Sequence, residues 1–258
     1  MNKKLLLNKQ CFWDLETSGA GKKEHPKAFE STPKWEQILQ IAAIVVDENL
    51  QPTNQNMNEF CRPRISIIAQ PGALLATQKG IKESLSAKHS SYELISKINN
   101  QFQEWKNENN NLVFIGHNAI QFDSTVLEYN LFNNLYFPYI DRKSRGDTLN
   151  LSRAMYALNP ASIKTPLTAK GNPSFRLEKL ADLNNLPVEF AHDAYSDVKT
   201  SIALTKFISD SDPDNWEQLT MSMNKEKAIE YINKNKGFCY MTTFAGRIKL
   251  EALSVVCE

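Results

Sequence analysis

The chain has 258 residues, of which 41% are hydrophobic, enough for an ordinary packed core. Its 30 basic and 29 acidic side chains give a formal net charge of +1 at pH 7. That balance excludes a uniformly basic nucleic-acid-binding body and leaves only local basic strips. Four cysteines without C-x-x-C spacing indicate neither a zinc site nor a redox pair. Too few apolar residues follow one another for a signal peptide or a membrane span, so we expect a cytoplasmic protein.

The first predicted strand covers about residues 10–16, an apolar run interrupted only by Asp14 and Glu16. Residues i and i+2 of a strand point to the same face, so both carboxylates project together. Their repulsion disfavours ionisation unless a cation lies between them, and Mg²⁺ takes such oxygen ligands. Taken alone, the motif is more typical of a solvated acidic pair on an edge strand, since exposed Asp and Glu are the rule.

Hydrophobic periodicity places further elements along the chain. It predicts strands at 38–47, at about 58–62 and at 112–115, with helices at 91–107, 120–134, 148–158, 175–184 and 193–209. Asp123 then lies in the first turns of a helix that leaves the carboxyl end of a buried strand, where crevices form in α/β sheets. An acid favoured by the helix dipole is the alternative explanation of Asp123.

The segment His192-Asp193-Ala194-Tyr195-Ser196-Asp197 is the most specific of the acidic motifs. Asp193 is a good N-cap candidate, which places Asp197 one turn into the last predicted helix and His192 on the incoming loop. Together with the two earlier motifs, the chain offers four carboxylates and one histidine. These groups suit the hydrolysis of a phosphodiester with two divalent cations.

The C-terminal part begins with a polar, proline-bearing segment at 209–215, which predicts a linker and a domain boundary. Residues 216–235 follow a helical pattern. Two strands at 238–244 and 248–256 then flank Ala245-Gly246-Arg247 and predict a hairpin. An isolated hairpin is marginally stable at best.

Several motifs resemble the DEDDh group of 3′→5′ exonucleases, and more closely the bacterial exonuclease I family. They are D-L-E-T at 14–17, G-H-N at 116–118 running to Phe122-Asp123, D-T-L-N-L at 147–151, M-Y-A-L-N-P at 155–160, P-S-F-R-L-E-K-L at 173–180 and A-H-D-A at 191–194. The resemblance covers about residues 10–208. The M-Y-A-L-N-P and P-S-F-R-L-E stretches distinguish this family from proofreading subunits and from oligoribonuclease.

The resemblance implies a role for eight residues. It implies that Asp14, Glu16, Asp123 and Asp197 bind two Mg²⁺ ions, for which Mn²⁺ substitutes, and that His192 is the general base. It further implies that Thr17, Asn118 and Arg176 hold the substrate. The segment 18–37 departs from the family pattern because it is a longer loop than expected.

The resemblance also implies an α/β fold, an RNase H-like mixed sheet flanked by helices, over residues 1–209. Residues 210–258 would supply a linker helix and the start of a small SH3-like β-barrel. We therefore expect a shortened chain that ends inside its second domain; a naturally short form is the alternative.

The function implied is degradation of single-stranded DNA to 5′-mononucleotides in DNA repair and recombination. An exonuclease for RNA or short oligonucleotides and a catalytically silent DNA-binding module are the alternatives. Partners would be single-stranded DNA and single-stranded DNA-binding protein, and the chain is expected to be a monomer that needs no membrane. Candidate basic strips are Lys22-Lys23, the run 142–145, and Arg176 with Lys179. Phe12, Trp13, Phe122 and Phe175 are stacking candidates, although core packing is the simpler explanation of each.

Overall fold

The computed structural model describes residues 9–19, 34, 36–66, 81–140, 143–189, 192–244 and 247–254. Within these ranges the strands are β1 (Gln10–Thr17), β2 (Ile38–Val46), β3 (Pro52–Phe60), β4 (Val113–Gly116), β5 (Arg145–Asp147), β6 (Gly237–Phe244) and β7 (Arg247–Ser254). The helices are α2 (Ile81–Leu85), α3 (Ser91–Glu108), α4 (Asp123–Asn133), α5 (Thr148–Leu158), α6 (Leu177–Leu183), α7 (Ala194–Ser211), α8 (Pro213–Met221) and α9 (Lys225–Asn235).

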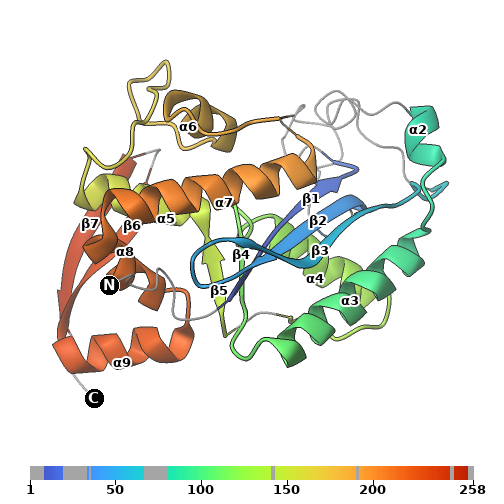
Figure 1. Cartoon of the computed structure of the whole chain (residues 1–258), viewed down its shortest axis with the longest axis horizontal. Coiled ribbons are helices and arrows are strands. Elements are labelled where there is room, and N and C mark those ends of the chain that lie inside the picture. Colours follow the sequence, from blue (N-terminus) through green and yellow to red (C-terminus); the bar gives the residue numbers. More distant parts are fainter. Residues whose placement is uncertain are drawn as a thin grey trace.

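The first five strands form one mixed sheet in the order β3-β2-β1-β4-β5. Strand β1 pairs antiparallel with β2 and parallel with β4, and β4 pairs parallel with β5. Helix α7 crosses one face of this sheet, while α3 and α4 lie against the other (Figure 1). The predicted RNase H-like mixed sheet flanked by helices is therefore confirmed.

Two hydrophobic clusters occupy the two faces, and the alternation along β1 assigns its side chains to them. Phe12 packs with residues of α5, α7 and α8. Cys11, Trp13 and Leu15 pack with residues of α3 and α4 on the opposite face. Asp14 and Glu16 have the parity of Phe12, so they project toward α7, as the spacing predicts.

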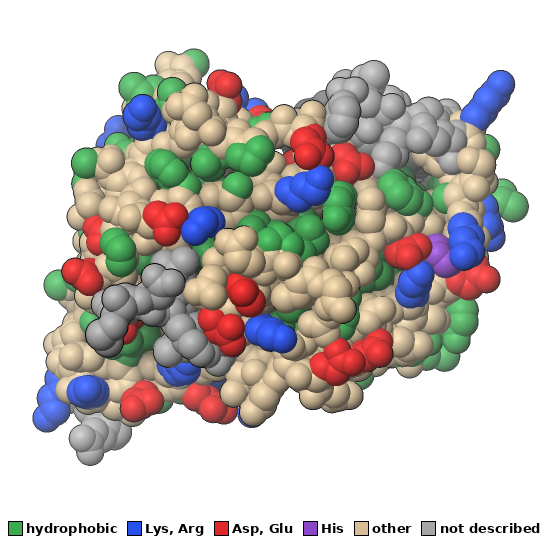
Figure 2. Space-filling model, viewed as in Figure 1, with side chains coloured by type: hydrophobic (Ala, Val, Ile, Leu, Met, Phe, Trp, Pro, Cys, Tyr) green, Lys and Arg blue, Asp and Glu red, His purple; other side chains and the backbone are tan. Residues whose placement is uncertain are grey.

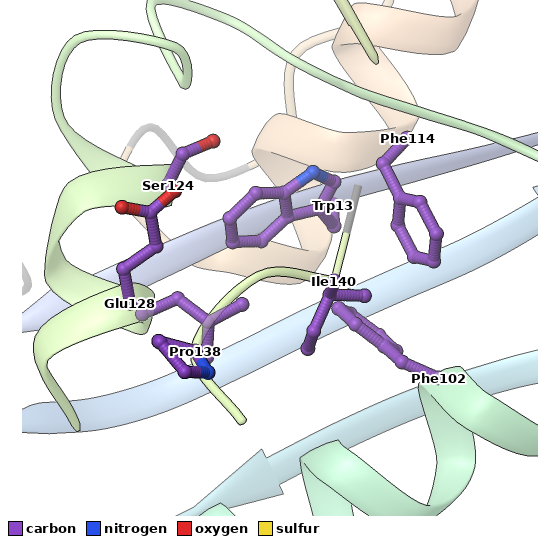
Figure 3. A pocket seen from close by; sticks show the side chains of 8 residues that line it. Trp13, Phe102, Phe114, Ser124, Glu128, Pro138 and Ile140 are labelled. Carbon is purple, nitrogen blue, oxygen red and sulfur yellow. The ribbon is translucent and has the colours of Figure 1, made fainter. Parts of the chain in front are cut away.

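The face turned away from α7 is closed by an aromatic cluster around Trp13. The ring centroids of Trp13 and Phe102 lie 6.1 Å apart, and those of Phe102 and Phe114 lie 4.9 Å apart. Figure 3 shows Trp13 beside Ser124 and Glu128 of α4, where a gap of about 10 Å³ remains. A gap that small holds at most one water, so this face supports β1 and offers no ligand site there.

Two strand predictions were wrong or incomplete. Strand β3 begins at Pro52, well before the predicted residue 58. Hydrophobic periodicity missed its first residues because most side chains of this strand are polar and Met57 is its one buried residue. Strand β5 was not predicted at all. Three residues long, it owes its conformation to the ladder with β4 rather than to a hydrophobic pattern.

The predicted linker at 209–215 is almost wholly helical. Helix α7 extends to Ser211, and Asp212 caps α8 by accepting a hydrogen bond from Asn215 N. The predicted helix 216–235 is in fact two helices, because Asn224 caps a new one. Trp216 of α8 is buried in the same hydrophobic cluster as Phe12, so α8 packs onto the main core. The domain boundary stays a prediction.

The C-terminal hairpin is confirmed, since β6 and β7 pair antiparallel from Gly237↔Ser254 to Phe244↔Arg247. Ile248 packs against the core cluster that contains Phe12. The SH3-like barrel stays a prediction. In the ranges that the structure describes, every helix is too short or too polar to cross a lipid bilayer.

Candidate active site

Strand β1 and helix α4 bring three of the predicted acids together. Asp123 is the first residue of α4, and its Oδ1 accepts a hydrogen bond of 3.2 Å from the backbone N–H of Leu15. Leu15 stands between Asp14 and Glu16, so the carboxylate of Asp123 is fixed beside that pair. The side chain of Asp123 is only 4% exposed.

Helix α7 supplies the fourth acid, and the residue just before its N-cap is the histidine. Asp193 caps the helix, accepting from Ser196 N at 3.2 Å, as predicted. Glu16, His192 and Asp197 each present a ligand atom, and these atoms lie within 4.8 Å of one another. His192 is exposed and has φ of 63°, a left-handed conformation that is costly for a residue with a Cβ and typical of functional sites.

The electrostatics of the cluster favour a bound cation. Burial, reinforced by Asp123, Glu16, Asp197 and Asp193, raises the pKa of Asp14 well above its usual range. Burial likewise raises the pKa of Asp123 to about 7 and that of Asp197 to about 6. Carboxyl groups that resist ionisation together are stabilised by a divalent cation between them, so this donor set fits Mg²⁺ or Mn²⁺.

Asp123→Asn is expected to stabilise the metal-free protein at pH 8 by at least about 3 °C in melting temperature. Because the folded protein binds an extra proton between pH 4 and about 7, its stability falls as the pH rises through that window and stays low above it. Each pKa unit corresponds to about 1.4 kcal/mol, and 1 kcal/mol shifts the melting temperature by roughly 2–4 °C at this chain length. Asparagine keeps an oxygen for Leu15 N and removes the charge.

The measurement is thermal unfolding at pH 5 and pH 8, with and without Mg²⁺. Wild type should gain more from Mg²⁺ than the variant does. Asp210→Asn is the matched control, because Asp210 is exposed and pairs with Lys206 of the same helix across 3.4 Å. A metal-free Asp123→Asn protein that melts at or below the wild-type temperature at pH 8 would contradict the cluster's electrostatics.

A groove of about 800 Å³ opens from this cluster. Its lining includes the acidic residues Asp14, Asp197 and Glu178, together with His192. It also includes Arg153 and Arg176, and further residues from α5, the segment before α6 and the hairpin, namely Leu149, Phe175, Leu177, Thr243 and Ile248. One continuous groove therefore joins an acidic cluster to cationic and apolar walls.

His117 connects three segments of the groove wall. Its Nε2 lies 2.9 Å from the carbonyl O of Phe175, and its Nδ1 lies 2.8 Å from Thr148 Oγ1. Since a carbonyl only accepts, Nε2 carries the proton and Nδ1 accepts from the threonine. Burial lowers the pKa of His117, which favours this neutral form. The end of β4, the start of α5 and the segment before α6 are thereby held together.

The predicted substrate residues have different outcomes. Asn118 and Arg176 line the groove, and the backbone N–H of Asn118 is held by Asp147 Oδ1 at 3.0 Å. Thr17 is buried and not among the groove residues; its hydroxyl lies 2.7 Å from Glu36 Oε2 and 2.8 Å from Gly19 O. The role expected of the Thr17 side chain therefore lacks support from its position.

The basic and aromatic residues predicted to contact a nucleic-acid strand are mostly absent from the described groove lining. Lys22-Lys23 and Arg142, like most of the 18–37 loop, lie outside the described residues. Phe12 and Trp13 are core residues, and Phe175 alone of the four stacking candidates reaches the groove. Figure 2 shows acidic and basic side chains interspersed on the coloured part of one face, in keeping with the near-zero net charge.

Sequence reasoning missed Arg153 and Glu178 as groove residues. Arg153 lies four residues after Leu149 on α5, so helical spacing puts both on one face. Its guanidinium carbon lies 6.0 Å from the centroid of the Phe175 ring. Glu178 is two residues after Arg176, and its charge helps to raise the pKa of Asp197. The available signal was the position of Arg153 on the less buried face of α5. Hydrophobic periodicity identifies that face but does not indicate that it binds a ligand.

Comparisons with known proteins agree with this geometry. A family model described as an exonuclease (RNase_T) matches residues 11–205. Exodeoxyribonuclease I of Escherichia coli K12 is 30% identical over 211 residues, covering 80% of this chain and 43% of that protein. Exodeoxyribonuclease I of Haemophilus influenzae is 29% identical over 215 residues, covering 82% of this chain and 42% of that protein.

Solved structures give the same result. The structure of E. coli exonuclease I in complex with a dT13 oligonucleotide has a TM-score of 0.79 and 27% identity, and the match covers 95% of this chain and 52% of that chain. The chain thus spans about half, or less, of the length of these relatives.

Proposed function

The chain belongs to the exonuclease family whose model matches residues 11–205, and on that premise we propose that it is a 3′→5′ exonuclease of single-stranded DNA that releases 5′-mononucleotides. The observation that carries the proposal is the convergence of four acids and His192 beside a groove whose lining includes Asp14, His192, Asp197 and two arginines. The names of the relatives and the oligonucleotide in one of their structures support DNA as the substrate class.

Asp14, Glu16, Asp123 and Asp197 would hold two Mg²⁺ ions. When bound, such ions supply a reactive water at neutral pH and charge stabilisation for the leaving oxygen. His192 is exposed and lines the groove, and it would accept the proton of the attacking water. The carboxylates orient the reacting groups, and Leu15 N–H fixes the orientation of Asp123.

The arginine-bearing part of the groove would hold the strand. Arg153 and Arg176 can pair with phosphates, and Phe175 offers an aromatic surface for a base. Arg153 is partly immobilised, since its Nη1 lies 3.3 Å from Asn150 Oδ1. A guanidinium held in place loses less conformational freedom when a phosphate binds.

Arg153→Ala and Arg176→Ala are each expected to raise KM for single-stranded DNA roughly 10-fold and to lower the dependence of log binding constant on log salt by about 0.7. The turnover number should change little because neither residue belongs to the acidic cluster. Steady-state kinetics at several salt concentrations measure both effects. Arg64→Ala is the matched control, because Arg64 is exposed and does not line the groove. An unchanged KM and salt slope in both groove variants would show that the strand lies elsewhere.

Matched labelled DNA and RNA strands decide between the proposal and its alternatives. Faster removal of nucleotides from DNA is expected. Preference for RNA or very short strands would establish an exonuclease for RNA or short oligonucleotides. Binding without cleavage in Mg²⁺ would establish a catalytically silent DNA-binding module.

A further inference from the structure

Gln40 is a buried polar residue in the middle of the sheet, only 1% exposed. It lies on β2 directly opposite Glu16 in the antiparallel pair, so its side chain shares the face of Glu16 and of α7. Its Nε2 donates to Asp193 Oδ2 at 3.1 Å and to Asn58 Oδ1 at 3.0 Å. A long-range bond therefore ties the sheet to the cap of α7.

Asp193 links His192, which precedes it in the chain, to Asp197 in the first turn of that helix. Its Oδ1 accepts from Ser196 N at 3.2 Å, and its carbonyl O accepts from Asp197 N at 2.9 Å. His192 immediately precedes it in the chain. A shift of Asp193 consequently moves both His192 and Asp197 relative to Glu16.

Asp193 is also a fifth carboxylate near the cluster. Its charge is among the causes that raise the pKa of Asp14 and of Asp197. It is absent, within the described residues, from the group of potential metal ligands formed by Glu16, His192 and Asp197. Both of its carboxylate oxygens are engaged, one by the helix N-terminus and one by Gln40.

We propose that Gln40 is a positioning residue that holds Asp193 in its capping geometry and thereby sets His192 and Asp197 against Glu16. The inference rests on the proposed function. A neutral amide suits the task because it donates to Asp193 without adding charge beside Glu16. Gln40 does not line the groove, so its effect should fall on the chemical step and not on the grip on the strand.

Gln40→Met keeps the side-chain length and removes the donor. We expect kcat to fall roughly 10- to 100-fold, as misplaced catalytic groups require, with KM for DNA within about twofold of wild type and a higher Mg²⁺ concentration for half-maximal rate. Gln55→Met is the control, because Gln55 lies on β3 and hydrogen-bonds to Glu108 outside the site. Wild-type kcat and Mg²⁺ dependence in Gln40→Met would overturn the proposal, as would a loss confined to KM.

Asp193→Ser tests the same Gln40–Asp193 hydrogen bond from the other side, in case Gln40→Met impairs folding. Serine retains an N-cap acceptor but offers no second oxygen to Gln40. We expect a similar loss of kcat, and a double variant no worse than the more impaired single variant, because both remove one link. Fully multiplied losses would overturn the link. A wild-type protein that cleaves no strand would refute the proposed function instead, so the two failures are distinguishable.

Discussion

Asp14→Asn is expected to reduce cleavage of single-stranded DNA by roughly 10³-fold or more, with binding of the strand still measurable. Asp14 lies where the charges of Glu16, Asp123 and Asp197 all act on it, so it is central to the proposed metal site. Asparagine has nearly the same shape but no charge for the cations that supply positioning and charge stabilisation. Asp197→Ala should have a comparable effect, because Asp197 shares the cluster with Glu16 and His192.

Single-turnover cleavage and a separate binding assay measure the two properties. Binding should persist because the substitution leaves Arg153, Arg176 and Phe175 of the groove lining unchanged. Asp210→Asn, exposed on α7, is the matched control and should cleave like wild type. Wild-type rates in Asp14→Asn, or full activity of the wild type in excess EDTA, would refute metal-dependent chemistry at this site.

His192→Ala is expected to lose about 10²- to 10⁴-fold in cleavage rate, the usual contribution of a general base. Trace activity should remain because the four acids keep the proposed metal site. The ring of His192 is exposed and has a nitrogen within 4.8 Å of ligand atoms of Glu16 and Asp197. The melting temperature should change little, since an exposed side chain contributes little to the core.

His89→Ala provides the comparison for that variant. His89 pairs across 2.9 Å with Glu59 of the edge strand β3, and neither residue lines the groove. It should lose stability without losing cleavage rate. A His192→Ala enzyme as fast as wild type would show that another group accepts the proton.

The sequence predicts much of this site because its geometry is local. Two-residue spacing puts Asp14 and Glu16 on one face of β1, and the capping residue Asp193 sets Asp197 one turn into α7. Helix α5 and the terminal hairpin likewise follow from helical periodicity and from two strands that flank a turn. Each of these features depends on neighbours within a few residues, which a pattern can record.

What the sequence did not predict depends on partners far along the chain. Strand β5 exists because β4 offers an open edge. The hydroxyl of Thr17 is turned toward Glu36, and the amide of Gln40 reaches Asp193 across 153 positions. Arg153 shares the groove with Phe175, which follows it by 22 positions in the chain. The hydrophobic periodicity of one segment does not indicate which distant residues its side chains will contact.

The proposed function is tested most directly with a single-stranded DNA labelled at its 5′ end and incubated with the purified chain. In Mg²⁺ the labelled strand should shorten progressively from its 3′ end and release 5′-mononucleotides. EDTA or a blocked 3′ terminus should stop the reaction, and a blocked 5′ terminus should not. Shortening that survives EDTA, or that starts from the 5′ end, would contradict the account.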